Sequence, residues 1–167
     1  MSELYVELLV KRKKTAKDTM LKVLLIAGIV LTAFAGLFIH PLALLLTVVL
    51  GVVAYFKMPS LDLEFEYLYV NGELDVDKIM SKVKRKRVGS FDIEKADLVA
   101  PWKSHELDYY RQSKDIKILD YSSGEENANV YAMVTKDDKG MKIVLFEPNE
   151  AILNDMRRIS PRKVKLS

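Results

Sequence analysis

Hydrophobic positions follow two unlike patterns along the chain. Residues 23–56 form a nearly continuous apolar run without a single Asp, Glu, Lys or Arg. A helix needs about 20 apolar residues to cross a bilayer, so the run is too long for one span. His40-Pro41 interrupts it, and proline disfavours helix at the preceding residue while suiting the start of a new helix. We therefore predict a transmembrane helical hairpin over 19–57, with helices at about 20–39 and 41–56.

The residues after the run alternate between apolar and polar side chains. In LDLEFEYLYV (61–70) one strand face carries Leu61, Leu63, Phe65, Tyr67 and Tyr69, and the other carries Asp62, Glu64 and Glu66. Asn71-Gly72, a dipeptide favoured in two-residue hairpin turns, leads into a second strand, ELDVDKIM. Further strands are predicted at KRKRVGSFDI, ADLVAP, IKILDY, NVYAMVT and MKIVLFE, with at most one helical turn over 102–115.

A helix is predicted after the last strand, in EPNEAILNDMRRISP. Proline suits its first turn, and the apolar residues Ile152, Leu153, Met156 and Ile159 line one face. Strands in meander order followed by one amphipathic helix match the element order of a pleckstrin-homology-like (PH-like) barrel. We predict a mostly-β domain over 60–167, a small PH-like barrel of about seven antiparallel strands capped by the C-terminal helix. An SH3-like barrel and a helix-on-sheet α+β fold are the alternatives.

Residues 1–18 form a leader with an apolar side and a basic cluster that begins at Lys11. The pattern predicts an interfacial helix, although the spacing of its apolar residues also suits a strand. The chain's net charge of +3 resides in the first 22 residues, whereas the turn at His40 has no Lys or Arg. The positive-inside rule then places both termini in the cytoplasm, with two spans in the cytoplasmic membrane. A signal peptide cleaved near Ala33-Phe34-Ala35-Gly36 is the alternative.

Small residues recur at a spacing of four within the predicted spans. They are Gly28, Thr32, Gly36, Thr47 and Gly51. Small side chains at this spacing let two helix backbones approach closely. We expect them to pack the two helices of the hairpin together, with packing between two copies of the chain as the alternative.

Candidate chemistry is sparse. The chain has no cysteine, and its two histidines, His40 and His105, are predicted on opposite sides of the membrane. There is no glycine-rich phosphate loop and no nucleophile elbow. Asp75 and Asp77 share a strand face, where a solvated surface is a more ordinary role than a catalytic pair. We predict no enzymatic activity, no catalytic residues, no metal site and no cofactor.

Two local features suggest binding. The first is the basic run Lys82, Lys84, Arg85, Lys86 and Arg87. These cations suit anionic lipid headgroups, or they lie on a solvated hairpin whose cations pair with acids across the strands. No aromatic residue interleaves with them, so nucleic-acid binding is not expected. The second feature is an aromatic group, Trp102, Tyr109 and Tyr110, which suits a ledge for a protein partner or a cover for the domain's flank.

Several segments carry a family resemblance, namely YVELLVKRKKTAKD, the two-span hairpin, FEYLYVNGELDVDKI, KRKRVGSFDI and FEPNEAI with PRKV. Together they resemble an uncharacterised family of small two-span membrane proteins of Gram-positive bacteria with a cytosolic PH-like domain. The resemblance covers nearly the whole chain. It implies topology and fold, and no functional residues.

The pattern and the resemblance together predict a membrane-tethered, non-enzymatic binding or scaffold module at the inner face of the cytoplasmic membrane. Its expected partners are membrane lipids and another protein. The alternatives are an anionic-lipid sensor and an accessory subunit of a membrane transport complex. The apolar spans carry no charged residue, which argues against an ion pathway.

Overall fold

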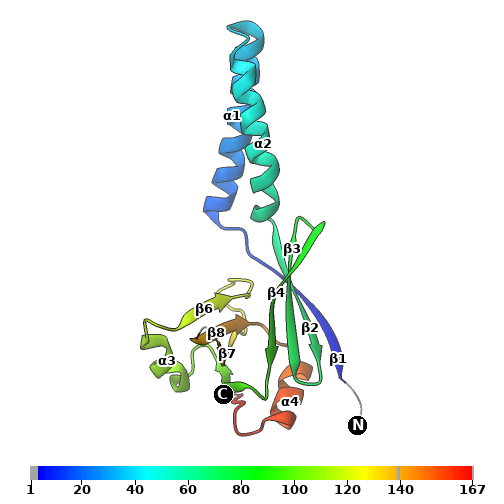
Figure 1. Cartoon of the computed structure of the whole chain (residues 1–167), viewed down its shortest axis with the longest axis vertical. Helices are drawn as coiled ribbons and strands as arrows, with labels where there is room; N and C mark the ends of the chain where they lie inside the picture. The colour runs from blue at the N-terminus through cyan, green and yellow to red at the C-terminus, as the bar shows by residue number, and fades with distance from the viewer. Residues whose placement is uncertain (1–3, 139, 167) are drawn as a thin grey trace. The chain divides into compact units, whose positions relative to one another are not determined.

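The computed structural model describes residues 4–138 and 140–166 and divides into two compact units. The first unit contains the chain up to residue 12, residues 64–79, and residues 85 onward. The second contains residues 13–63 and 80–84. The chain therefore begins in the first unit, leaves it for a helical segment, and returns (Figure 1).

The second unit contains two long apolar helices, as the sequence predicted. They are α1 (Ala16–Phe38) and α2 (Ala43–Lys57), and α2 continues into the short helix η1 (Met58–Leu61). Both helical segments are long and apolar enough to cross a membrane. Helix α1 begins four residues earlier than expected because Thr15 caps it. The Thr15 hydroxyl accepts from the Asp18 N–H at 3.2 Å, and Asp18 accepts from the Thr15 N–H at 2.9 Å.

Small residues lie where α1 and α2 meet. The Thr47 hydroxyl donates to Thr32 Oγ1 at 3.0 Å. A Cβ atom on Gly36 would lie 2.6 Å from Leu44 Cγ, so the helices touch there only because Gly36 has no side chain. A Cβ atom placed on Gly28 would lie 3.4 Å from Leu50 Cδ1, whereas nothing lies within 4 Å of a Cβ atom placed on Gly51.

The first unit is built on two four-stranded sheets. The first sheet has the order β1-β2-β3-β4. Its strands are β1 (Tyr5–Lys11), β2 (Leu63–Val70), β3 (Glu73–Met80) and β4 (Lys84–Asp92). Asn71 and Gly72 both have positive φ, which gives the predicted tight turn between β2 and β3.

Strand β1 corrects the prediction of an interfacial helix at the N-terminus. It pairs antiparallel with β2, so that Val6 and Leu8 lie opposite Tyr69 and Tyr67, and Lys11 lies opposite Glu64. Alternate residues of the leader are apolar, and this period of two places them in the core beside the aromatic residues of β2. The domain consequently extends beyond the predicted 60–167, and the helical hairpin is an insertion between two paired strands.

The second sheet corrects the expectation of a closed, seven-stranded antiparallel barrel. Its order is β5-β7-β8-β6, formed by β5 (Ala96–Pro101), β6 (Lys117–Asp120), β7 (Tyr131–Asp137) and β8 (Gly140–Phe146). Strands β5, β7 and β8 pair antiparallel, whereas β6 pairs parallel with β8. The described strands number eight because β1 adds to the seven predicted ones. They form two separate sheets, and β6 lies beside β8 instead of continuing a meander.

Helix α4 (Glu150–Ile159) packs its apolar face into the core, as predicted. Asn149 caps it by accepting from the Ile152 N–H at 2.9 Å. Ile152 and Met156 are fully buried among residues of both sheets. A smaller apolar cluster is centred on Leu107, Ala132 and Ile143. The segment with η2 (His105–Leu107) and α3 (Asp108–Gln112) contributes to this smaller cluster. The main core is enclosed by the two sheets and α4.

Candidate binding sites

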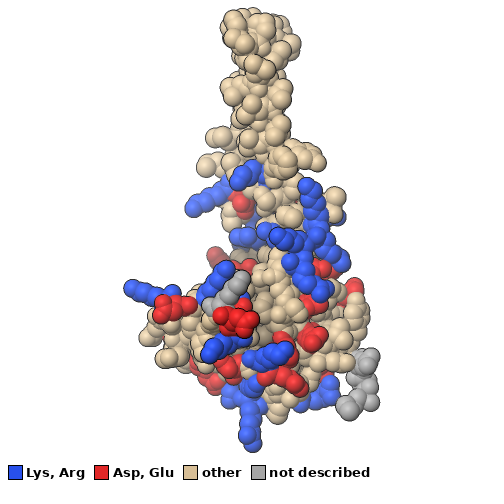
Figure 2. All heavy atoms as spheres, viewed as in Figure 1, with Lys and Arg blue, Asp and Glu red and all other residues tan. Residues whose placement is uncertain are grey.

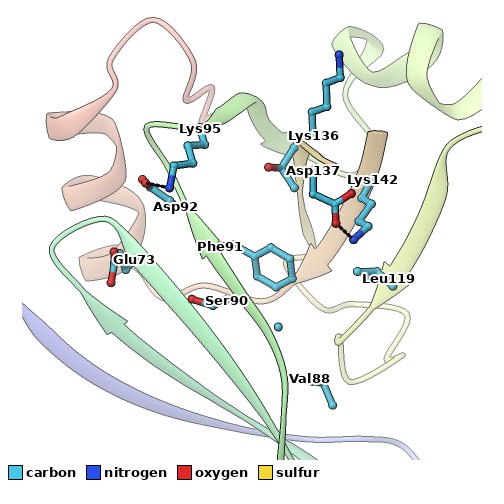
Figure 3. Close-up of a pocket in the computed structure, with 12 residues that line it drawn as sticks. Glu73, Val88, Ser90, Phe91, Asp92, Lys95, Leu119, Lys136, Asp137 and Lys142 are labelled. Atoms are coloured by element: carbon cyan, nitrogen blue, oxygen red, sulfur yellow. Dashed lines mark hydrogen bonds and ion pairs between the residues drawn. The ribbon is translucent and has the colours of Figure 1, made fainter. Parts of the chain in front are cut away.

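A cleft of about 400 Å³ opens beside strand β4, within the first unit. Its lining comes from β4 and from β6, β7 and β8 of the second sheet. Figure 3 shows the Phe91 side chain extending from β4 toward these strands, with Leu119 on the opposite side. Val88 completes an apolar floor of three side chains. The volume is that of an ordinary ligand pocket or of a few residues of a bound peptide.

Gly89 leaves room for the Phe91 ring, which forms part of the floor of the cleft. A Cβ atom at this position would lie 2.4 Å from the Phe91 ring, so any side chain would displace the ring. Phe91 also packs against Tyr121, with ring centroids 6.3 Å apart and the ring planes tilted by 41°. The position of the aromatic floor therefore depends on Gly89 and on Tyr121.

The rim of the cleft carries charges of both signs. Lys95 pairs with Asp92 at 3.3 Å, and Lys142 pairs with Asp137 (Figure 3). Lys136 and Glu73 form no ion pair with any described residue. An apolar floor below a mixed, largely neutralised rim suits an extended protein segment better than a highly charged small molecule. Across residues 4–138 and 140–166, no group of three His, Cys, Asp or Glu is placed to hold a metal ion.

The basic run divides into two parts with different surroundings. Arg85 contacts Glu66 at 2.7 Å, and Arg87 contacts Asp75 at 2.9 Å and Asp77 at 3.3 Å. These acids lie on β2 and β3 of the same sheet, so two of the five predicted lipid contacts are already paired with carboxylates. Lys86 forms no ion pair with a described residue.

Lys82 and Lys84 flank the turn between β3 and β4. Ser81 and Lys82 have φ of 49° and 59°, a conformation that costs a residue with a side chain roughly 1 kcal/mol or more. Val83, between the two lysines, is 83% exposed. The Ser81 N–H donates to the Asp62 carbonyl at 2.9 Å, and Lys84 Nζ lies 5.7 Å from the centre of the Tyr55 ring. The turn is thus held at the foot of α2.

Cations gather at the foot of the helical hairpin in the second unit (Figure 2). The unit holds two aspartates and seven lysines, which we call the basic collar: Lys13, Lys14, Lys17, Lys22, Lys57, Lys82 and Lys84. Lys14 pairs with Asp62 at 3.1 Å. The excess of positive charge lies at the end of the hairpin where the chain enters and leaves, and the turn between the helices has none.

The three residues of the predicted aromatic group differ in how deeply they are buried. Trp102 and Tyr110 pack against the smaller apolar cluster, whereas Tyr109 is 77% exposed. Tyr109 and Tyr110 meet edge to face with centroids 5.4 Å apart. Trp102 also borders a second cavity beside residues 125–130.

The cleft beside β4 was not predicted from the sequence. Its floor comes from β4 and β6, and its rim includes residues from β7 and β8, which only the folded sheets bring together. The one local signal is Gly89 two residues before Phe91, since glycine inside a strand often marks a close approach.

A family model described as Bacterial PH-like domain (DUF6106) matches residues 2–166. Neither a curated protein nor a solved structure matches the chain.

Proposed function

Because the chain belongs to the bacterial PH-like domain family (DUF6106), we propose that it is a membrane-tethered, non-enzymatic binding module. The hairpin anchors it in the cytoplasmic membrane, and the PH-like domain lies at the inner face. The basic collar supports this orientation, since lysines concentrate at the end of the hairpin that joins the domain.

Single cysteines test the orientation cleanly, because the natural chain has none. In intact cells, His40→Cys should react with a membrane-impermeant thiol reagent, and Lys114→Cys should react only after the membrane is opened. Both positions are exposed in the structure, so shielding by the fold does not explain a difference. Labelling of Lys114→Cys from outside would reverse the proposed orientation.

The partner that the geometry supports best is a segment of another protein, bound in the cleft beside β4. The observation that carries this proposal is the apolar floor of Val88, Phe91 and Leu119 beneath a rim whose charges are mostly paired. Such a surface gains binding energy when a partner buries an apolar side chain against the floor. The charged rim keeps the surface around the floor hydrated when no partner is bound.

A photo-reactive residue in place of Leu119 should give one discrete adduct with a protein in native membranes. Phe91→Ser removes the aromatic floor and should abolish the adduct, whereas Tyr109→Ser removes an exposed aromatic elsewhere and should not. The melting temperature of each variant serves as the folding control. An adduct that persists in a folded Phe91→Ser protein would exclude the cleft as the binding site.

Anionic lipid is a second candidate, favoured by the turn at Lys82-Val83-Lys84. An exposed valine between two lysines suits an interface of headgroups and acyl chains. Phosphatidylglycerol, added to the full chain in neutral detergent, should raise the melting temperature more than phosphatidylcholine. Lys82→Ser/Lys84→Ser should reduce the difference, and Lys103→Ser/Lys114→Ser should preserve it. Equal stabilisation by both lipids would reject this candidate.

A further inference from the structure

A second cavity, of about 340 Å³, lies beside Trp102 and shares no lining residue with the cleft. One wall is the end of β5 with Pro101 and Trp102, and the other is the segment that leads into β7, residues 125–130. The Trp102 N–H donates to the Val130 carbonyl at 2.8 Å, which ties the two walls together.

Arg111 holds the tryptophan in place. Its guanidinium lies 5.3 Å from the centre of the Trp102 ring and donates to the carbonyls of Trp102 and Ser104, each at 3.0 Å. Asp108 accepts a further hydrogen bond from the same group. The indole therefore presents a fixed, apolar wall to the cavity, because both its backbone and its ring are restrained.

The opposite wall carries two free carboxylates. Neither the Glu125 nor the Glu126 side chain forms an ion pair or a hydrogen bond with any residue in the described part of the chain. Lys103 also lines the cavity but pairs with neither glutamate. An apolar wall opposite two unpaired acids is complementary to an aliphatic stem that ends in a cation.

We propose that this cavity binds a lysine or arginine side chain of an extended segment in a partner protein. The stem of that side chain packs against Trp102, Pro101 and Val130, and its charged end reaches Glu125 and Glu126. This site is separate from the cleft and does not depend on what the cleft binds.

Trp102 supplies the measurement, since it is the only tryptophan of the chain. The full chain in neutral detergent is titrated with capped Gly-Lys-Gly and Gly-Arg-Gly peptides while its fluorescence is recorded. Gly-norleucine-Gly, which has a similar stem without the charge, is the reference. We expect saturable changes and about tenfold tighter binding of the cationic peptides, because two exposed charge pairs together contribute about that factor.

Variants of the acidic wall separate this proposal from a general charge effect. Glu125→Gln/Glu126→Gln should reduce the affinity for the lysine peptide to that for the norleucine peptide, and Glu94→Gln, on an exposed turn, should not. Glu125→Lys/Glu126→Lys should reverse the preference toward a capped Gly-Glu-Gly peptide. Unchanged affinity in the folded Gln variant, or equal binding of the lysine and norleucine peptides, would overturn the proposal. Tighter binding of free cadaverine than of the lysine peptide would overturn the assignment to a protein side chain.

Discussion

Tyr69 has no exposure to solvent, and its hydroxyl donates to Asp155 Oδ2 at 2.8 Å. The same carboxylate accepts from Arg158 at 2.9 and 2.6 Å. The interaction joins β2 to helix α4 through a polar pair inside the core. Tyr67 is equally buried, and its hydroxyl donates to the Tyr121 carbonyl at 2.6 Å. Two buried hydrogen bonds thus join β2 to helix α4 and to Tyr121, the residue that follows β6.

Replacing Tyr69 by Phe should destabilise the domain by about 1–2 kcal/mol, because a buried carboxylate loses one of its donors. The change is measured by denaturant unfolding of the full chain in detergent, with the β-strand signal in circular dichroism as the readout. Tyr109→Phe is the matched control, since the Tyr109 side chain is 77% exposed. Equal stability of the two variants would show that the hydroxyl of Tyr69 contributes nothing.

The buried tyrosines also predict a loss of stability at alkaline pH. Burial raises the pKa of Tyr67, and burial together with the Asp155 hydrogen bond raises the pKa of Tyr69. Their contribution is complete below the unfolded-state pKa of about 10 and is lost as pH rises above it, since only the unfolded chain then releases these protons. The midpoint of urea unfolding should fall above about pH 10. Tyr67→Phe/Tyr69→Phe should flatten that dependence, and Tyr109→Phe should leave it unchanged.

At the scale of elements, the contact between α1 and α2 depends on small side chains. Thr32 and Thr47 join the helices with one hydrogen bond, and Gly36 allows Leu44 to approach. Gly51 belongs to the same spacing of small residues in the sequence, but nothing lies within 4 Å of a Cβ atom placed on it. The two glycines therefore differ in role although their local sequences look alike.

An engineered disulfide between α1 and α2 tests how closely the two helices approach. In Thr32→Cys/Thr47→Cys, two sulfur atoms replace oxygens that lie 3.0 Å apart, so mild oxidation in membranes should form an intramolecular bridge. Adding Gly36→Leu should slow the bridge, because its Cβ atom already meets Leu44. Adding Gly51→Leu should not. Bridges that form mainly between two chains would place these residues at an interface between copies instead.

At the scale of the whole molecule, the domain is completed by strand β1, which precedes the hairpin in sequence. Lys11 lies opposite Glu64, so the two strands end as neighbours where the helical segment is inserted. Residues 13–62 can therefore be replaced by an Asn-Gly turn that joins Arg12 to Leu63. We expect this shortened chain to be soluble and to unfold cooperatively.

The fragment 60–167 provides the comparison. It lacks β1 and exposes one edge of β2, whose residues Phe65, Tyr67 and Tyr69 are buried in the full chain. This fragment should aggregate or melt at a clearly lower temperature than the shortened chain with the Asn-Gly turn. If both proteins are equally stable, β1 is not part of the folded core.

Much of this architecture follows from local sequence patterns. Alternation at the start of β2 and the Asn71-Gly72 turn predicted the hairpin of β2 and β3, and apolar spacing in α4 predicted its buried face. Strand β1 was ambiguous because its apolar residues fit both periods. The parallel pairing of β6 with β8 and the cleft floor depend on contacts between distant residues, which no local pattern records.

The position of the hairpin between β1 and β2 has a consequence for biosynthesis. β1 leaves the ribosome before either helix, but its partner β2 emerges only after both. On the proposed topology, the first sheet can close only when both helices cross the membrane and return the chain to its starting side. A copy in which one helix fails to cross would strand β1 and β2 on opposite sides of the bilayer. The proposed topology therefore makes the crossing of both helices a precondition of folding, and a copy with only one crossing would have an open, protease-sensitive domain.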